Sequence, residues 1–116
     1  MAKILVIEDD KEILAVVELI LHEEGHDVEG SFYGNILDDI NSIMPQLIIL
    51  DDWLGKEKGS DLCIKLKSDP KTSLIPVVLF SAHNDSEELA QLIKADAFIR
   101  KPFDIDELIK VVNSLL

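Results

Sequence analysis

The chain is poor in cysteine and in basic residues. Cys63 is the only cysteine among the 116 residues, which excludes an internal disulfide and a zinc site built from cysteines. Lysine and arginine number 11 against 23 aspartate and glutamate residues, which gives a net charge of −12. Because contacts to nucleic-acid phosphates require clustered basic residues, we expect no direct nucleic-acid partner. A cation or a basic protein surface fits this charge better.

Long apolar runs are also missing. No stretch approaches the ~20 apolar residues of a membrane-spanning helix. Met1-Ala2-Lys3 leads directly into an apolar run of about five residues, which is shorter than the core of a secretory signal peptide. We therefore expect a domain of the reducing cytoplasm with no membrane contact. Hydrophobic residues make up 47% of the chain, enough for the core of one domain.

Short β-rich runs alternate with segments of helical periodicity along the chain. Strands are predicted at residues 3–7, 26–32, 47–50, 76–80 and 97–100. Helices are predicted at residues 11–23, 35–44, 60–68, 85–94 and 104–116. This alternation indicates an α/β fold with a parallel sheet covered on both faces. No linker interrupts the pattern, so we expect one domain over residues 1–116 and no output domain within them.

Several of the predicted helices have residues at their ends that are typical of helix starts or stops. Gly25 is a plausible stop for the first helix, and Pro45 ends the second, since the residue before proline avoids the helical conformation. Ser60 is expected to cap the third helix, with Ile64 among its inward-facing residues, and Asp104 is expected to cap the last helix.

Four of the apolar runs end in reactive polar residues. In chain order these are Glu8-Asp9-Asp10, Asp51-Asp52, Ser81 and Lys101-Pro102. In an open parallel sheet, ligands bind outside the carboxyl ends of the strands, so we expect these side chains to meet at one edge. Acids hold a hard cation, while a hydroxyl and an ammonium hold an anion. The combination suits Mg²⁺-assisted phosphoryl transfer.

Each of these residues, taken alone, also has an ordinary structural interpretation. Asp51 is typical of a turn acid at a strand end. An acidic triplet from Glu8 to Asp10 is favoured at a helix start by the helix dipole, and we interpret Asp10 in this way. Ser81 and Lys101 are typical of a turn serine and a solvated lysine. The four motifs together, in this order, favour the chemical interpretation.

The pattern resembles the receiver domain of bacterial two-component response regulators, in particular single-domain regulators of the chemotaxis type. The segments that carry the resemblance are ILVIEDD at 4–10, PQLIILD at 45–51, IPVVLFSA at 75–82 and KPFD at 101–104. The resemblance implies a flavodoxin-like, doubly wound sheet of five parallel strands in the order 2-1-3-4-5, with five helices.

By this resemblance, Asp51 is the phosphoacceptor, whose carboxylate forms a covalent acyl phosphate. Asp9 is expected to bind Mg²⁺ directly, and Glu8 through a water molecule. Asp51 and the backbone carbonyl of Trp53 are expected to complete the protein's share of the metal ligands.

The resemblance also assigns the remaining strand-end residues. Ser81 hydrogen-bonds the new phosphoryl oxygen, and Lys101 pairs with it as a point charge. The family has a cis peptide bond at the position of Pro102. Phe98 occupies the position of a switch aromatic that turns inward when Ser81 moves. Core packing explains Phe98 equally well, and both interpretations stay open.

Three features depart from the family pattern. Asp52 stands where an apolar residue is usual, and it either extends the metal site or competes as an acceptor. Gly55 stands where a proline is common, which indicates a looser loop. Lys94 stands where a glycine often ends the fourth helix, and the spacing from Ser81 to Lys101 is slightly short. A shortened or shifted fourth helix would alter the usual output surface.

The implied function is a phosphorelay receiver. A sensor histidine kinase or a phosphotransfer protein donates a phosphoryl group with Mg²⁺, and an unidentified downstream protein reads the switch. Such a domain catalyses only its own phosphorylation and dephosphorylation. The alternative is a constitutive interaction module of receiver architecture, uncoupled by Asp52 or by the altered fourth helix. A Mg²⁺-dependent phosphohydrolase of small molecules is a third hypothesis, although no cap segment for a substrate is present.

Overall fold

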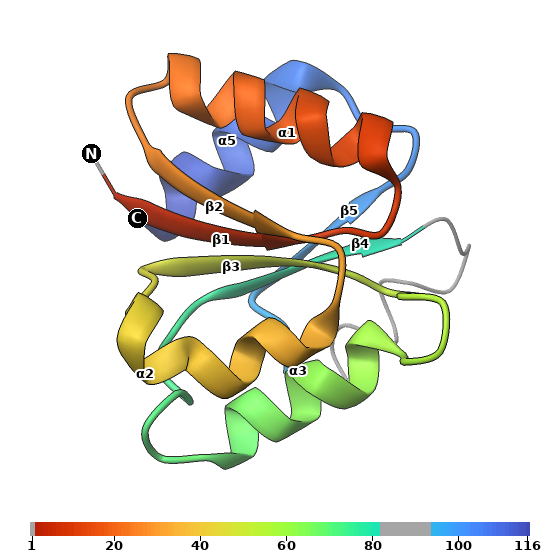
Figure 1. The fold of residues 1–116 in the computed structure, drawn as a ribbon. Coiled ribbons are helices and arrows are strands. Elements are labelled where there is room, and N and C mark those ends of the chain that lie inside the picture. Colours follow the sequence, from red (N-terminus) through yellow and green to blue (C-terminus); the bar gives the residue numbers. More distant parts are fainter. Residues whose placement is uncertain (1, 82–93) are drawn as a thin grey trace.

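The computed structural model describes residues 2–81 and 94–116. A parallel sheet of five strands forms its centre, as predicted (Figure 1). The strands are β1 (Lys3–Ile7), β2 (Asp27–Ser31), β3 (Leu47–Asp51), β4 (Val77–Ser81) and β5 (Ala97–Arg100). Their order is β2-β1-β3-β4-β5, and every neighbouring pair is parallel. The expected strand order 2-1-3-4-5 is therefore confirmed.

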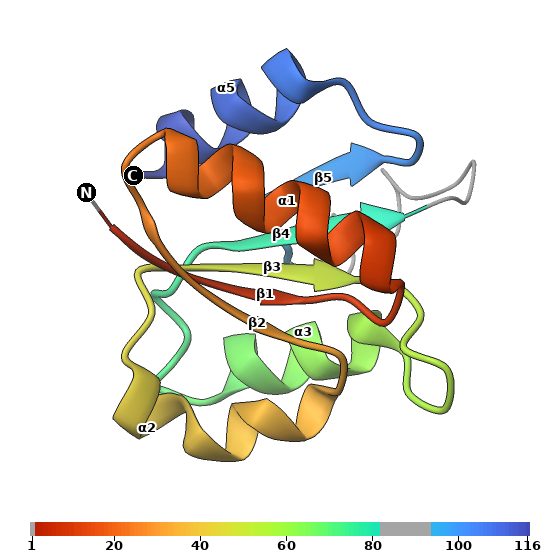
Figure 2. The ribbon, with the colours of Figure 1, turned by 45° about the horizontal axis from the view of Figure 1, so that its top comes forward.

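Helices cover both faces of the sheet. The described helices are α1 (Lys11–Glu23), the 3₁₀ helix η1 (Gly34–Asp39), α2 (Ile40–Ile43), α3 (Gly59–Ser68) and α5 (Ile105–Leu115). Figures 1 and 2 show α1 and α5 on one face of the sheet, with α2 and α3 on the other. The helix predicted at 85–94 lies outside the described residues, except for Lys94.

Alternating side chains divide the core into two layers, one on each face. The layer under α1 and α5 takes Leu47 and Ile49 from β3, whereas the layer under α2 and α3 takes Ile48 and Leu50. All residues of β3 and β4 are buried, as is usual for central parallel strands with both faces covered. Cys63 packs in the second layer, where burial raises the pKa of its thiol to about 11.

One predicted helix cap, one predicted acidic helix start and one predicted stop are confirmed. An oxygen of Asp10 accepts hydrogen bonds from the backbone N–H groups of Glu12 and Ile13, at 2.9 and 3.2 Å. Asp104 caps α5 in the same manner. Gly25 follows α1 with a φ of +88°, a left-handed conformation that glycine adopts at little cost.

The prediction of an α-helix at residues 35–44 was wrong over part of that segment. Residues 34–39 form the 3₁₀ helix η1, and only residues 40–43 form an α-helix. Glycine and asparagine begin this segment and two aspartates follow, all of which are weak helix formers. Apolar spacing alone therefore overstated its helicity.

The predicted start of the third helix was also wrong. Lys58 is the N-cap residue of α3, without a side-chain capping bond, and Ser60 lies buried in the first turn. The N–H of Gly59 donates instead to the carbonyl oxygen of Asp52, at 2.7 Å. A contact with the end of β3 thus sets the helix start. Ile64, which was expected to face inward, is exposed.

A lysine fixes the approach to β4. The ammonium of Lys67 donates to the carbonyl oxygen of Ile75 at 2.8 Å and to the carboxylate of Asp96 at 2.6 Å. Asp96 also accepts the backbone N–H of Val77, at 2.8 Å. The end of α3 is thereby tied to the starts of β4 and β5. Within the described ranges, no helix is long and apolar enough to cross a membrane.

Two exposed positions with left-handed backbone give opposite expectations for stability. A Cβ on Gly25 meets nothing within 4 Å, so Gly25→Ala is expected to lower the free energy of unfolding through backbone strain alone, by about 1 kcal/mol. Met44 is 74% exposed with a φ of +52°, and Met44→Gly is expected to raise that free energy by about 0.5 kcal/mol. Urea unfolding of the two variants measures both effects, and equal signs would contradict the explanation.

Candidate functional site

Three acidic side chains meet at the carboxyl end of the sheet. Glu8 and Asp9 follow β1, and Asp51 is the last residue of β3. One carboxylate oxygen of each residue lies within 4.8 Å of the other two. Glu8 and Asp51 are buried, whereas Asp9 is exposed. The structure thus brings together the three carboxylates that the sequence proposed as metal ligands.

Lys101 enters the same cluster from the end of β5. Its ammonium donates a hydrogen bond to Oε1 of Glu8 and lies 3.2 Å from Oδ1 of Asp51. The peptide bond between Lys101 and Pro102 is cis, as the resemblance implied. One cation therefore bridges the two buried carboxylates.

Ser81 lies on the other side of the sheet plane. The pairing of β3 with β4 sets Asp51 opposite Phe80, and the N–H of Asp52 donates to the carbonyl of Phe80 at 2.7 Å. Since side chains alternate along a strand and Phe80 belongs to the layer under α1 and α5, Ser81 points toward the α2 and α3 layer. The hydroxyl of Ser81 donates to Oδ2 of Asp52 at 3.1 Å, between two buried residues. The two consecutive aspartates thus serve opposite faces.

Phe98 lies on the same face as Ser81. It pairs with Leu79 in the register of β4 and β5, and its half-buried ring packs against the layer under α2 and α3. This placement agrees with core packing, and it also leaves the ring on the side from which Ser81 would move. The switch role of Phe98 stays a prediction.

The loop after Asp51 is closed by backbone hydrogen bonds. The N–H of Leu54 donates to the carbonyl of Glu57 at 2.8 Å, and Trp53 forms an isolated bridge with Lys58. Gly55 turns the loop with a φ of +78°, so a glycine here meets a backbone need rather than merely loosening the loop. Trp53, whose carbonyl the sequence proposed as a metal ligand, lies exposed in this loop.

Gly59 is a functional position that the sequence reasoning missed. A Cβ at this residue would overlap the carbonyl oxygen of Asp51, so the start of α3 approaches the site more closely than any side chain permits. The available signal was a glycine directly before Ser60, the expected cap. Reading it required knowledge of which backbone lies opposite.

Burial and crowding shift the pKa values of the cluster. Burial, followed by the neighbouring Glu8 carboxylate, raises the pKa of Asp51 to about 7, against the opposing charge of Lys101. Burial and Asp51 likewise raise the pKa of Asp9. Burial lowers the pKa of Lys101, but the hydrogen bond to Glu8 and the charges of Asp51 and Glu8 outweigh it, and the net shift is upward. One ammonium therefore does not balance three carboxylates.

These residues fit a hard divalent cation. Oε2 of Glu8 is buried and has no hydrogen-bond partner among residues 2–81 and 94–116. Carboxylate oxygens are the ligands that Mg²⁺ takes, usually one or two per ion together with water. A divalent ion would supply the missing positive charge and a partner for the orphaned oxygen.

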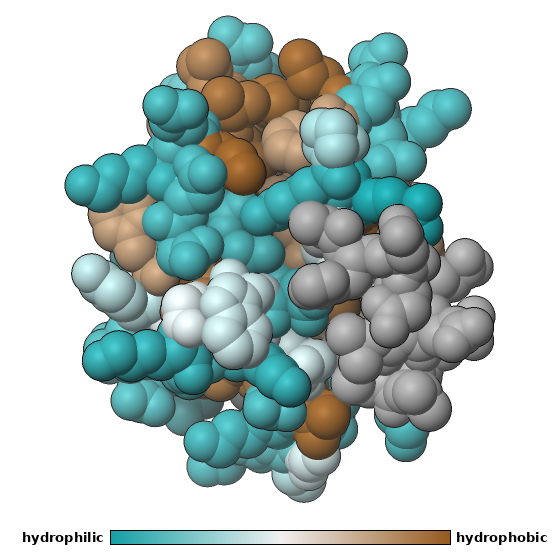
Figure 3. Space-filling view, turned by 90° about the vertical axis from the view of Figure 1, so that its right-hand side faces the viewer, coloured by the Kyte–Doolittle hydropathy of each residue, from teal (hydrophilic) through white to brown (hydrophobic). Residues whose placement is uncertain are grey.

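The surface around the site contains both hydrophilic and hydrophobic residues (Figure 3). Figure 3 shows the side of the molecule at the carboxyl ends of the strands, with hydrophobic atoms gathered toward α1 and α5. An apolar groove there is lined by residues that include Ile13, Val16, Pro102 and Phe103.

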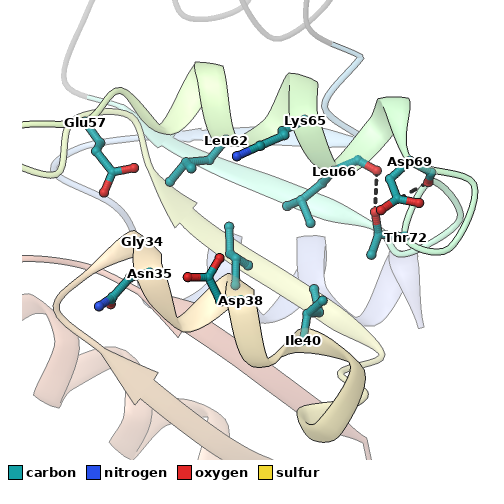
Figure 4. A pocket seen from close by; sticks show the side chains of 11 residues that line it. Gly34, Asn35, Asp38, Ile40, Glu57, Leu62, Lys65, Leu66, Asp69 and Thr72 are labelled. Carbon is teal, nitrogen blue, oxygen red and sulfur yellow. Dashed lines mark hydrogen bonds between the residues drawn. The ribbon is translucent and has the colours of Figure 1, made fainter.

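A separate cavity of about 310 Å³ lies between η1 and α3. Figure 4 shows Asp38 and Lys65 on its opposite walls, with the hydroxyl of Thr72 bonded to the carbonyl of Leu66. The acidic cluster is not among the residues that line this cavity. A cavity that does not include the cluster of Glu8, Asp9 and Asp51 gives no support to hydrolysis of a small substrate by that cluster.

Comparison with known proteins agrees with the site. The family model for the response regulator receiver domain matches residues 4–113. The chain is 34% identical over 119 residues to the DNA-binding dual master transcriptional regulator RpaA of Synechocystis sp., covering 100% of this chain and 49% of that protein. It is 33% identical to the response regulator ArlR of Staphylococcus saprophyticus, covering 100% of this chain and 53% of that protein.

A solved structure extends the likeness to the backbone. The receiver domain of the Francisella response regulator 1452 matches with a TM-score of 0.89 and 30% identity, over 99% of this chain and 96% of that chain. The chain spans about half the length of the curated relatives it matches. Because one of those relatives is named as DNA-binding, the expected lack of a nucleic-acid partner is not confirmed and stays a prediction for this stretch.

The raised pKa of Asp51 gives a pH-dependent prediction for the metal-free protein. The folded state holds this proton more tightly than the unfolded chain, whose value is near 3.8, so the stabilising contribution is lost as the pH rises toward about 7. Asp51→Asn removes this loss. The variant is therefore expected to exceed the wild type in unfolding free energy clearly at about pH 8 and little at about pH 5.

Urea unfolding with a chelator, and again with Mg²⁺, measures this difference. Saturating Mg²⁺ is expected to restore the wild type at the higher pH but not to change Asp51→Asn as much. Glu23→Gln, which removes an exposed acid at the end of α1, is the control. A constant difference between wild type and Asp51→Asn across this pH range would refute the assignment.

Gly59→Ala is expected to damage both stability and the site. Its Cβ requires the backbone of Asp51 to shift, which costs about 2 kcal/mol or more. Mg²⁺ affinity, followed by the fluorescence of Trp53, the only tryptophan, should fall as well. Gly55→Ala is the matched loop control, since its Cβ meets nothing within 4 Å and the substitution adds only the backbone strain of a positive φ, about 1 kcal/mol. Equal losses in the two variants would show that the close approach does not matter.

Proposed function

Because this chain belongs to the receiver domain family of response regulators, we propose that it is a phosphorelay receiver with Asp51 as the phosphoacceptor. The observation that carries this proposal is the bridge by Lys101 between Glu8 and Asp51, within a cluster that also includes Asp9. A buried carboxylate at a strand end would serve as a nucleophile only if neighbouring cations offset its charge and that of the incoming phosphoryl group.

The transfer step exchanges one bond to phosphorus for another. An oxygen of Asp51 forms a P–O bond while the P–N bond to a histidine of the donor protein breaks. The electron pair stays on the imidazole nitrogen, which takes up a proton from solvent. When bound, Mg²⁺ neutralises charge on the transferring oxygens and on the carboxylates around them. Glu8, Asp9, Asp51 and the carbonyl of Trp53 are the residues we propose to hold it.

Lys101 is proposed to act in both states of the site. Before transfer its ammonium offsets the charges of Glu8 and Asp51, and after transfer it pairs with a phosphoryl oxygen. The hydroxyl of Ser81 would donate to another phosphoryl oxygen, which requires it to leave its present acceptor. Phe98 would then take up the space on that face of the sheet.

Hydrolysis of the acyl phosphate returns the domain to its starting state. The oxygen of a water molecule bonds to phosphorus while the bond between phosphorus and the Asp51 oxygen breaks. The carboxylate is restored, and inorganic phosphate leaves with the oxygen of the water, whose released proton passes to the phosphate or to solvent. The domain is thus proposed to act on its own acyl phosphate and on no other substrate.

The proposed partners are proteins. A sensor histidine kinase or a phosphotransfer protein would supply the phosphoryl group in the reducing cytoplasm, and an unidentified downstream protein would read the result. The net charge of −12 supports protein contact rather than nucleic-acid contact by this stretch of chain.

A second candidate is a constitutive interaction module with the same architecture. The observation that favours it is the hydrogen bond from Ser81 to Asp52, which occupies the hydroxyl that a switch would use. In this case the domain binds its partner equally well with and without a donor of phosphoryl groups.

Intact-mass spectrometry separates these candidates. With acetyl phosphate and Mg²⁺, the wild type is expected to gain one phosphoryl group, whereas Asp51→Asn gains none. Asp52→Asn, a matched change at the adjacent acid, should keep the adduct. Lys101→Met is expected to slow its formation roughly tenfold or more, because a charge-assisted contact is lost.

Two other results would contradict the assignment of Asp51 or the receiver function. An adduct that survives Asp51→Asn would place the acceptor elsewhere. A wild type that never gains mass, although it binds Mg²⁺, would favour the constitutive module.

A further inference from the structure

The buried carboxylate of Asp52, which accepts from Ser81, is the feature that the proposed chemistry leaves without a role. Asp52 is 7% exposed and Ser81 is fully buried, and the hydroxyl of Ser81 donates to the Asp52 carboxylate at 3.1 Å. The family resemblance implied that an apolar residue is usual at the position of Asp52, and it gave Asp52 no role. An apolar side chain at this position has no oxygen to accept the hydroxyl proton.

We propose that Asp52 is a positioning residue that holds the Ser81 hydroxyl away from the phosphoacceptor, so that phosphorylation must displace it before the domain switches. This inference rests on the proposed receiver function and deepens it. Asp52 makes no contact with the transferring group in the proposal, and it acts only through Ser81.

Proton counting carries the first step of the argument. A serine hydroxyl has a single proton, and it cannot be given fully to two acceptors at once. If a phosphoryl oxygen on Asp51 is to receive it, the bond to Asp52 must break. Hydrogen bonds to a charged acceptor are stronger than neutral ones, and burial preserves their strength. The two anions therefore compete for one proton.

The backbone around Asp52 makes this competition unequal. Its N–H donates to the carbonyl of Phe80 and its carbonyl accepts from Gly59, both at 2.7 Å. The backbone of Asp52 is thereby held between β4 and the start of α3, so the residue as a whole does not move together with Ser81. Movement of the hydroxyl must break the bond rather than carry both partners along.

The consequence is a conformational equilibrium shifted toward the unswitched state. The unswitched state gains the bond between Ser81 and Asp52, which the switched state lacks. The fraction of switched molecules at a given level of phosphorylation should therefore be lower than in a domain with an apolar residue at this position.

Binding of beryllofluoride with Mg²⁺ tests the proposal at equilibrium. Beryllofluoride mimics a phosphoryl group on a carboxylate, and the fluorescence of Trp53 follows its binding. Asp52→Asn keeps the shape of the side chain and a weak acceptor, while Asp52→Leu removes the acceptor. Both variants are expected to bind the mimic more tightly than the wild type, and Asp52→Leu roughly tenfold more tightly.

Removal of a negative charge near the site would also tighten binding, and the Ser81→Ala background separates the two causes. The charge effect persists when the hydroxyl is gone, whereas the competition for its proton does not. We expect the gain from Asp52→Asn, and that from Asp52→Leu, to shrink clearly in this background. Because Asp52→Asn conserves shape, the test holds even if Asp52→Leu fails to fold.

Binding of the mimic by the wild type distinguishes failure of this inference from failure of the proposed receiver function. If the wild type binds the mimic but the gain is the same with and without Ser81, Asp52 acts only through its charge and this inference is overturned. If the wild type neither binds the mimic nor gains a phosphoryl group from acetyl phosphate, the proposed receiver function falls, and this inference falls with it.

Discussion

Crowding of negative charge at the carboxyl end of the sheet is the constraint on which the rest of the structure depends. Glu8 and Asp51 end neighbouring central strands, so the parallel sheet forces their carboxylates together. The ammonium of Lys101 reaches both from a residue 93 positions further along than Glu8. It satisfies only part of the charge, since the pKa of Asp51 is still raised to about 7. The cluster is thus prepared for a further cation.

The sequence predicted the fold well wherever burial leaves a simple pattern. β3 and β4 are covered on both faces, so each is a continuous apolar run whose ends are easily located. The order of the strands came from a family resemblance, because apolar runs carry no information about which strand lies beside which. The start of α3 was not predictable, since it depends on contact between Gly59 and the backbone of Asp51 and Asp52.

The residues of the site likewise fall into those whose position could be predicted from the sequence and those whose contacts could not. The rule that ligands bind at the carboxyl ends of parallel strands predicted that Glu8, Asp9, Asp51 and Lys101 would meet. It placed Ser81 at the same edge but could not give the partner of its hydroxyl. Alternation along the strands indicates that Asp51 and Ser81 point to opposite faces, but β3 ends at Asp51 and the pattern does not extend to Asp52. The acid next to Asp51 is the one that Ser81 finds, on the face opposite the cluster.

This separation places the acidic cluster and the proposed switch residues on opposite faces of the sheet. The acidic cluster lies on the side of α1 and α5, while Ser81 and Phe98 belong to the side of α2 and α3. A single peptide bond, between Asp51 and Asp52, joins the two sides at the point of reaction. In the proposed function, a phosphoryl group on Asp51 would reach the opposite layer most directly by accepting the Ser81 proton that Asp52 now accepts. If Asp51 is the acceptor, as we propose, coupling between the two faces would depend on how firmly Asp52 retains Ser81, and not on the acidic cluster alone.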